Sequence, residues 1–116
     1  MNDSLPSLGV ETTVAIFGGK WCPLILLQLI PKPRHFGELL RLVPGISKRV
    51  LVAQLRRMEG EKIIDRKVFG PPPAIVQYAL TDYGRSLVPL LDVMCKWGHR
   101  HAGLYPRPRS KTTRKG

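Results

Sequence analysis

Cysteine is scarce in this chain of 116 residues, which contains two in all. Two cysteines cannot build a disulfide framework, so a reducing compartment, the cytoplasm, is the expected location. Long hydrophobic runs are also missing, because the apolar stretch Cys22–Ile30 is far shorter than the ~18–20 residues that span a bilayer. The N-terminus lacks the basic segment that begins a signal peptide, so neither membrane insertion nor secretion is expected.

Acidic residues are few as well. Eight Asp and Glu stand against 19 Lys and Arg, and the formal net charge of +11 favours a polyanionic partner. A hydrophobic content of 43% is enough for a modest core, and the length suits one domain, predicted to occupy residues 1–103. Residues 104–116 contain five basic residues, no acid and no apolar period, which predicts a disordered basic tail.

Patterns typical of enzymes and metal proteins do not stand out. There is no obvious set of nucleophile, base and orienting residue and no obvious pair of carboxylates, so catalysis is not expected. His99 and His101 are two residues apart, which places them on different faces of a helix and disfavours a metal site. Gly18-Gly19-Lys20 lacks the further glycine and the Ser/Thr of a phosphate-binding loop. We therefore expect no cofactor.

Apolar periodicity predicts three helices in the first half of the chain. Glu11–Phe17 is short and mostly apolar, and it ends at a Gly-Gly pair, a natural helix stop. Trp21–Ile30 is apolar on nearly all sides and has a proline in its first turn, where proline is tolerated. Such a helix belongs at the centre of the core. Residues 36–43 repeat apolar side chains at helical spacing and stop at a Pro-Gly turn.

The following helix is expected to begin after Ser47, a good N-cap residue, with Ile46 and Leu51 placed for a hydrophobic staple. Its apolar stripe consists of Leu51, Leu55 and Met58, spaced i, i+4 and i+7. The opposite face is small and basic, and carries Arg49, Val52, Ala53 and Arg56, with Lys48 at the leading end and Arg57 at one flank.

After Lys62 the composition changes from helical to strand-like. Ile63–Phe69 and Ile75–Leu80 are rich in β-branched and aromatic residues, and a segment with three prolines separates them. This pattern predicts a two-stranded hairpin with a stiff tip. The first strand carries Arg66 and Lys67, which would reach flanking phosphates or the minor groove.

A long helix is predicted to end the ordered part of the chain. Thr81 or Asp82 would cap it, and Pro89 inside it would kink it by removing a backbone hydrogen bond. Its core-like positions are Leu87, Leu90, Leu91, Met94 and Cys95. The predicted fold class is thus mainly α with a small β-hairpin, in the order of a winged helix-turn-helix with an extra helix at each end.

This arrangement is suited to duplex DNA. A helix of about 10–12 Å diameter fits the ~12 Å major groove, where each base pair presents a distinct pattern of donors and acceptors. Arg49 and Arg56 would pair with guanine or phosphate, and the small Val52 and Ala53 would allow close approach and contact with a thymine methyl. RNA is disfavoured, because aromatic residues do not alternate with basic ones along the hairpin.

Several segments together resemble the HxlR-type winged helix-turn-helix transcriptional regulators. They are Gly18-Gly19-Lys20-Trp21, Arg34–Leu39, Pro44–Leu51, Leu55-Arg56, Val76–Leu87 and Trp97-Gly98, and the resemblance covers about residues 9–97. It implies sequence-specific DNA binding as a homodimer joined through the terminal helices, here interpreted as a repressor on a pseudo-palindromic operator. The resemblance places Ser47, Lys48, Arg49, Val52, Ala53 and Arg56 on the operator and residues 66–75 in the wing. Arg57, Arg66 and Lys67 complete the predicted DNA-binding set.

Two positions depart from the family pattern. Many members that sense quinones, aldehydes or oxidants carry a cysteine and a proline ahead of the first helix, where this chain has Leu8 and Gly9. Many also have a glycine just before the first wing strand, where this chain has Lys62, so Gly60 is expected to end the helix instead.

Two alternatives to a plain DNA-binding regulator stay open at this point. One is a redox-responsive regulator that uses Cys22, which lies near a helix N-terminus beside a lysine, a setting that can lower a thiol pKa. The other is a winged-helix module whose main partner is a protein. The sequence points to no particular small-molecule effector.

Overall fold

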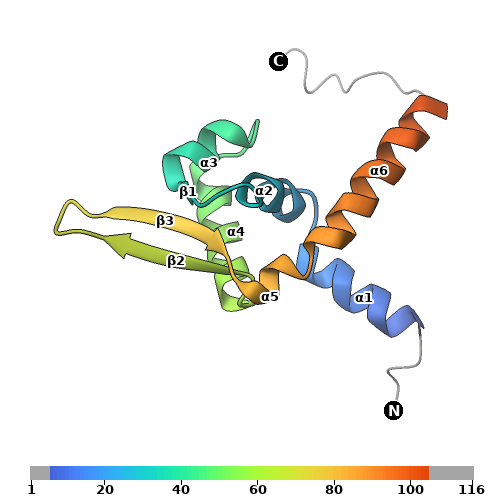
Figure 1. The fold of residues 1–116 in the computed structure, drawn as a ribbon, viewed down its shortest axis with the longest axis horizontal. Helices are drawn as coiled ribbons and strands as arrows, with labels where there is room; N and C mark the ends of the chain where they lie inside the picture. The colour runs from blue at the N-terminus through green and yellow to red at the C-terminus, as the bar shows by residue number, and fades with distance from the viewer. Residues whose placement is uncertain (1–5, 105–116) are drawn as a thin grey trace.

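The computed structural model describes residues 6–104, which form six helices and three strands in one body with two projecting helices (Figure 1). The predicted basic tail beyond residue 104 lies outside the described residues. The elements in chain order are α1 (Pro6–Phe17), α2 (Trp21–Leu29), β1 (Arg34–His35), α3 (Phe36–Leu42), α4 (Lys48–Gly60), β2 (Ile64–Phe69), β3 (Ile75–Leu80), α5 (Asp82–Arg85) and α6 (Val88–Leu104). The predicted fold class, a winged helix-turn-helix with an extra helix at each end, is confirmed.

Helix α2 lies at the centre of the core, as its apolar composition predicts. Cys22, Ile25, Leu26 and Leu29 are all buried. Around them pack the stripe of α4, the inner face of α3 and the base of the hairpin, all within one hydrophobic cluster. The cluster holds α4 firmly from one side only, so its opposite face is left to solvent.

The hairpin is confirmed, and a third strand accompanies it. β2 and β3 pair antiparallel from Ile64 opposite Leu80 to Phe69 opposite Ile75. β1 pairs with β3 on the other side, giving the order β1-β3-β2. With two residues, β1 is too short to show a strand pattern in the sequence. The hairpin extends from the body on the side opposite α1 and α6 (Figure 1).

The prediction of one long C-terminal helix is wrong, because the chain forms two helices there, α5 and α6. Thr81 caps α5, because its hydroxyl accepts the Gly84 N–H at 2.8 Å. Gly84 packs so tightly that a Cβ there would lie 2.0 Å from the carbonyl oxygen of Ile63, and α5 is held against the sheet. The helix breaks before Val88, so Pro89 lies in the first turn of α6, where proline costs no hydrogen bond and no kink is needed.

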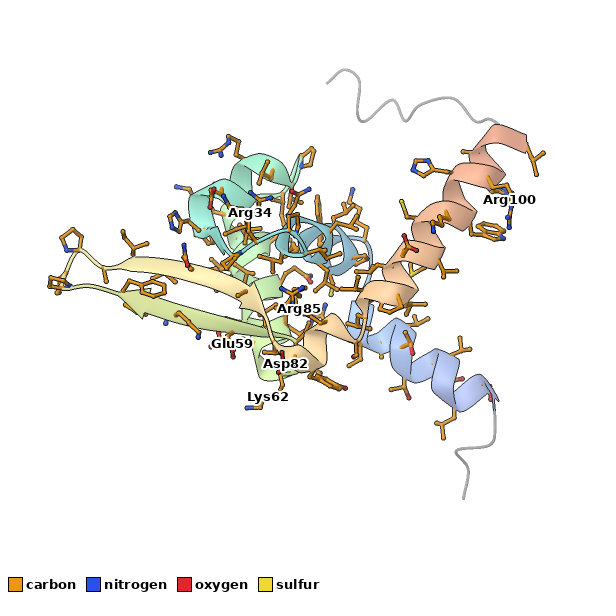
Figure 2. The ribbon with its side chains drawn as sticks, in the orientation of Figure 1. Arg34, Glu59, Lys62, Asp82, Arg85 and Arg100 are labelled. Atoms are coloured by element: carbon orange, nitrogen blue, oxygen red, sulfur yellow. The ribbon has the colours of Figure 1, made fainter. Side chains whose placement is uncertain are left out.

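The end of α4 also differs from expectation. Gly60 is the last helical residue, but the chain is reversed at Lys62, which adopts the left-handed φ of +67° and whose side chain points away from the body (Figure 2). The Lys62 N–H donates to the Glu59 carbonyl and the Ile63 N–H to the Met58 carbonyl, both at 3.0 Å. This pair of bonds is a Schellman motif, whose reversing position favours glycine. Lys62 therefore occupies the position, just before the first wing strand, where a glycine was expected from the resemblance. Lysine lacks the conformational freedom that glycine has at this φ.

Replacing Lys62 by glycine should stabilise the protein. Glycine adopts a positive φ without the steric cost that a side chain brings, and we expect a gain of about 0.5–1 kcal/mol in the free energy of unfolding. Urea denaturation measures the change. Glu61→Gly, one residue earlier at φ −83°, is the matched control and should lose about 0.5–1 kcal/mol. Equal losses in both variants would contradict this account of the turn.

The two terminal helices project from the body (Figure 1). Of the positions expected to form a core on the last helix, Leu91 is buried and Leu87 is half-buried, but Leu90, Met94 and Cys95 are exposed. The stripe exists, yet within the described part of one protomer no element covers most of α6. In residues 6–104 no single helix is long and apolar enough to cross a membrane; the bent pair α1 and α2 passes by length and composition only.

Candidate nucleic-acid interface

Helices α3 and α4 form the helix-turn-helix pair. At the start of α3, the Glu38 carboxylate accepts the His35 backbone N–H at 2.8 Å, and this bond holds the pKa of Glu38 below its ordinary value. At the start of α4, the Ser47 hydroxyl accepts the Val50 N–H at 3.1 Å, which confirms the predicted cap. A hydrogen bond thus fixes the first residue of each of the two helices.

The exposed face of α4 consists of the residues that the sequence singled out. Leu51, Leu55 and Met58 are buried, at 0%, 2% and 0% exposure. The solvent side carries Lys48, Arg49, Val52, Ala53 and Arg56, with Ser47 exposed at the leading end. We call these six residues the recognition face. It combines three cations with two small apolar side chains, so nothing bulky prevents close approach to another surface.

A groove of about 400 Å³ lies between α4 and the sheet and is also lined by Phe36 of α3. Arg56 reaches it from α4 and Arg66 from β2, so two predicted DNA contacts from distant parts of the sequence meet at one place. Glu59 and Tyr78 also line the groove, and the sequence analysis missed both. Tyr78 lies opposite Arg66 in the strand register, so the hairpin pattern held a signal for it. The polar part of its lining consists of two guanidinium groups, one carboxylate and one phenol.

The hairpin is exposed along most of its length, as a wing that contacts another molecule would be. Arg66 and Lys67 are exposed on β2, and the segment of residues 70–74 at the tip is exposed throughout. Phe69 and Ile75, which pair next to the tip, keep 48% and 53% of their side chains exposed. About half of each of these two cross-strand partners is therefore left to solvent at the outer end of the hairpin.

Arg57, the remaining predicted contact, lies away from the recognition face. Its half-buried guanidinium donates to the carbonyl oxygens of Ile16 at 2.6 Å and Phe17 at 3.0 Å. A third bond joins it to the side-chain oxygen of Gln54 at 3.0 Å. These contacts join α4 to the end of α1 and engage Arg57 within its own chain, an arrangement that could not be predicted from the sequence.

The two cysteines differ in environment. Cys22 is fully buried, and burial raises the pKa of its thiol above the ordinary value, although the Arg57 guanidinium offsets part of that rise. Lys20, expected beside it, instead lies with its ammonium 4.5 Å from the Trp21 ring centre. Cys95 is exposed on α6. Within residues 6–104, no three His, Cys, Asp or Glu side chains are grouped so that they could hold a metal ion.

An open apolar groove of about 360 Å³ lies between the two terminal helices. Val10 and Val14 line it from α1, Leu90 and Met94 from α6, and Phe17 at the base. The valines keep 63% and 62% of their side chains exposed. Farther along α6, Val93 and Trp97 are also exposed, and the Trp97 ring stacks on His101 at 5.0 Å. Within residues 6–104, no other element covers these apolar side chains.

A capped helix after a turn, a small cationic face and a basic hairpin together define a winged helix-turn-helix module. The comparisons specify the family. Residues 16–104 match the family model described as HxlR-like helix-turn-helix. The uncharacterized HTH-type transcriptional regulator YtcD of Bacillus subtilis is 41% identical over 95 residues, which are 82% of this chain and 75% of that protein. The chain belongs to the HxlR-like helix-turn-helix family and is a transcriptional regulator of the helix-turn-helix type.

Solved structures agree with this assignment. The crystal structure of YtcD has a TM-score of 0.76 at 40% identity, with 81% of this chain and 96% of that chain covered. The redox regulator HypR in its reduced form has a TM-score of 0.79 at 35% identity, with 83% of this chain and 95% of that chain covered. Membership in this family implies DNA binding, and such regulators are generally not enzymes.

Proposed function

We propose that this protein binds duplex DNA sequence-specifically as a homodimer on a pseudo-palindromic operator and represses transcription there. The single observation that carries the proposal is the recognition face, because a capped helix with Arg49 and small neighbours projecting to solvent fits the major groove. Repression follows if the operator overlaps a promoter, since a bound dimer would exclude polymerase.

Arg49 is the residue we expect to select a base. It lies in the first turn of α4, and the leading residues of a recognition helix contact base edges. Its guanidinium can donate two parallel hydrogen bonds to guanine O6 and N7. Val52 and Ala53, one turn along, would contact a thymine methyl or allow the backbone to approach.

Arg56 and Arg66 are the residues that we expect to bind the phosphate backbone. Because they share the groove between α4 and the sheet, they are suited to hold one segment of phosphate backbone between helix and wing. Lys67, the next residue on β2, has its side chain on the opposite face of the hairpin, from which it would reach a flanking phosphate or the minor groove. Residues 105–116 would add affinity for any sequence, since their cations release counterions on binding.

A second copy of the chain is the proposed occupant of the groove between α1 and α6. Its apolar lining is exposed in one protomer, and a two-fold interface would bury the same patch on both copies. Recognition helices related in this way would address half-sites about one helical turn, ~34 Å, apart.

The redox alternative has some support, because HypR is a redox regulator of the same fold. Cys22 nevertheless lacks the exposed, low-pKa thiol that a sensor requires, since burial raises its pKa. A protein-binding module is the other alternative, and binding independent of salt and DNA sequence would favour it. Selection of bound duplexes from a random pool separates the proposed function from a protein-binding module, because only a sequence-specific dimer enriches an inverted repeat. A redox regulator would be recognised by a change in DNA affinity on oxidation that Cys22→Ser abolishes.

A further inference from the structure

Arg57 connects the helix that would contact DNA to the helix that would contact the second protomer. It lies on α4, and its guanidinium donates to the last two carbonyls of α1, those of Ile16 and Phe17. Gln54, one turn earlier on α4, accepts a further bond that orients the side chain. The contact spans 41 residues of sequence, so it is tertiary and not a local cap.

Helix α1 is attached to the body mainly at its C-terminal end, where Ile16 packs against the core. Among residues 7–17, Phe17 alone is buried. The chain then passes through two glycines with positive φ and turns by 74° into α2. Glycine restricts the backbone little, so a Gly-Gly joint would not by itself hold α1 at one angle. The Arg57 guanidinium can hold α1 at one angle, because its planar group of donors fixes the direction of the hydrogen bonds as well as their length.

The backbone at Gly18 also lies close against this guanidinium. A Cβ at this position would lie 2.9 Å from one terminal nitrogen of Arg57 and 3.0 Å from the guanidinium carbon. Its φ of +62° is also one that side chains rarely adopt. The joint is therefore shaped around the guanidinium, which occupies the space that a side chain at residue 18 would need.

We infer that Arg57 is a positioning residue: it fixes the angle between α1 and α4 and thereby the half-site separation that the dimer accepts. The inference rests on the proposed function, a dimer joined through the terminal helices. Helix α1 is long enough for a small change in its angle to alter the half-site separation. Helix α1 has 12 residues and a length of about 18 Å, so a swing of about 10° at its base moves its far end by ~3 Å, close to the 3.4 Å rise of one base pair.

The test measures affinity for a series of duplexes in which the two half-sites of the selected operator are moved apart or together by single base pairs. Wild-type protein should lose about tenfold in affinity for a change of one base pair, because half-site spacing is set by dimer geometry. Arg57→Gln should lose about threefold or less, giving a flattened profile, while its dimerisation constant stays within about twofold of wild type. Arg85→Gln, which removes the same charge from an exposed position on α5, should keep the sharp profile.

Gly18→Ala keeps Arg57 but crowds its guanidinium and strains the joint at φ +62°, so it should flatten the profile as well and serves as a second way to disturb the joint if Arg57→Gln does not fold. A profile that stays as sharp as wild type in a folded variant would overturn the inference and leave the proposed function intact. An equal loss of affinity at every half-site spacing would also overturn the inference, because Arg57 would then contribute to affinity without setting the spacing. If wild type itself shows no preferred spacing, the dimeric function fails first.

Discussion

Val14→Lys should leave the protein folded but monomeric, with operator affinity reduced by about 100-fold or more. Val14 lines the groove between α1 and α6 and is 62% exposed, so the lysine is harmless in one protomer. In a two-fold interface the change occurs twice, and each ammonium would be buried against apolar side chains. A cost of about 1.5–3 kcal/mol per copy amounts to at least ~3 kcal/mol, a factor of ~100 in affinity.

Sedimentation and operator titration together measure this effect. The matched control is Val68→Lys on the wing, at 53% exposure, which should remain dimeric because it lies far from α1 and α6. Met94→Lys approaches the same groove from α6 and should reproduce the Val14→Lys result. If Val14→Lys and Met94→Lys both stay dimeric, this groove is not the protomer interface.

Arg49→Ala should weaken operator binding by about 1–3 kcal/mol in each half-site, or roughly 2–6 kcal/mol for the dimer, and relax base preference at one position per half-site. Arg49 is exposed beyond the cap of α4 and has no part in the core, so the loss should come from the DNA contact alone. Binding to non-operator duplex should change far less, since a base contact adds little to non-specific affinity.

Titration at fixed salt against the operator and a base-substituted operator measures both effects. Arg85→Ala removes the same charge outside the recognition face and should have little effect. Arg56→Ala should differ from Arg49→Ala: if Arg56 holds backbone phosphate in the groove with Arg66, its loss weakens binding to all sequences. Unchanged operator affinity in both Arg49→Ala and Arg56→Ala would rule out α4 as the recognition helix.

Most of the fold could be predicted from the sequence because it depends on local patterns. The stripe Leu51, Leu55 and Met58 identified the buried side of α4, and its complement identified the recognition face. The cap at Ser47 and the hairpin were equally local. The same reasoning failed where a residue has two local interpretations, as at Pro89, which is a kink inside a helix but harmless in a first turn.

The remaining features depend on contacts between distant residues. Arg57 has the sequence context of a solvent-facing cation beside Arg56, and only the approach of α1 in space engages it with the Phe17 carbonyl. The groove shared by Arg56 and Arg66 likewise requires the packing of helix against sheet. On α6, the spacing of apolar residues predicted core positions that the structure leaves exposed, because periodicity does not distinguish a core from a surface that a second copy would bury.

Selection of bound duplexes from a random pool at physiological salt, followed by sequencing, tests the central claim most directly. We predict a single enriched inverted repeat whose half-site centres are about one helical turn apart, ~34 Å, and whose best-defined positions include a G·C pair lost in Arg49→Ala. A pool with no enriched motif, bound equally at all sequences, would contradict sequence-specific recognition by the dimer.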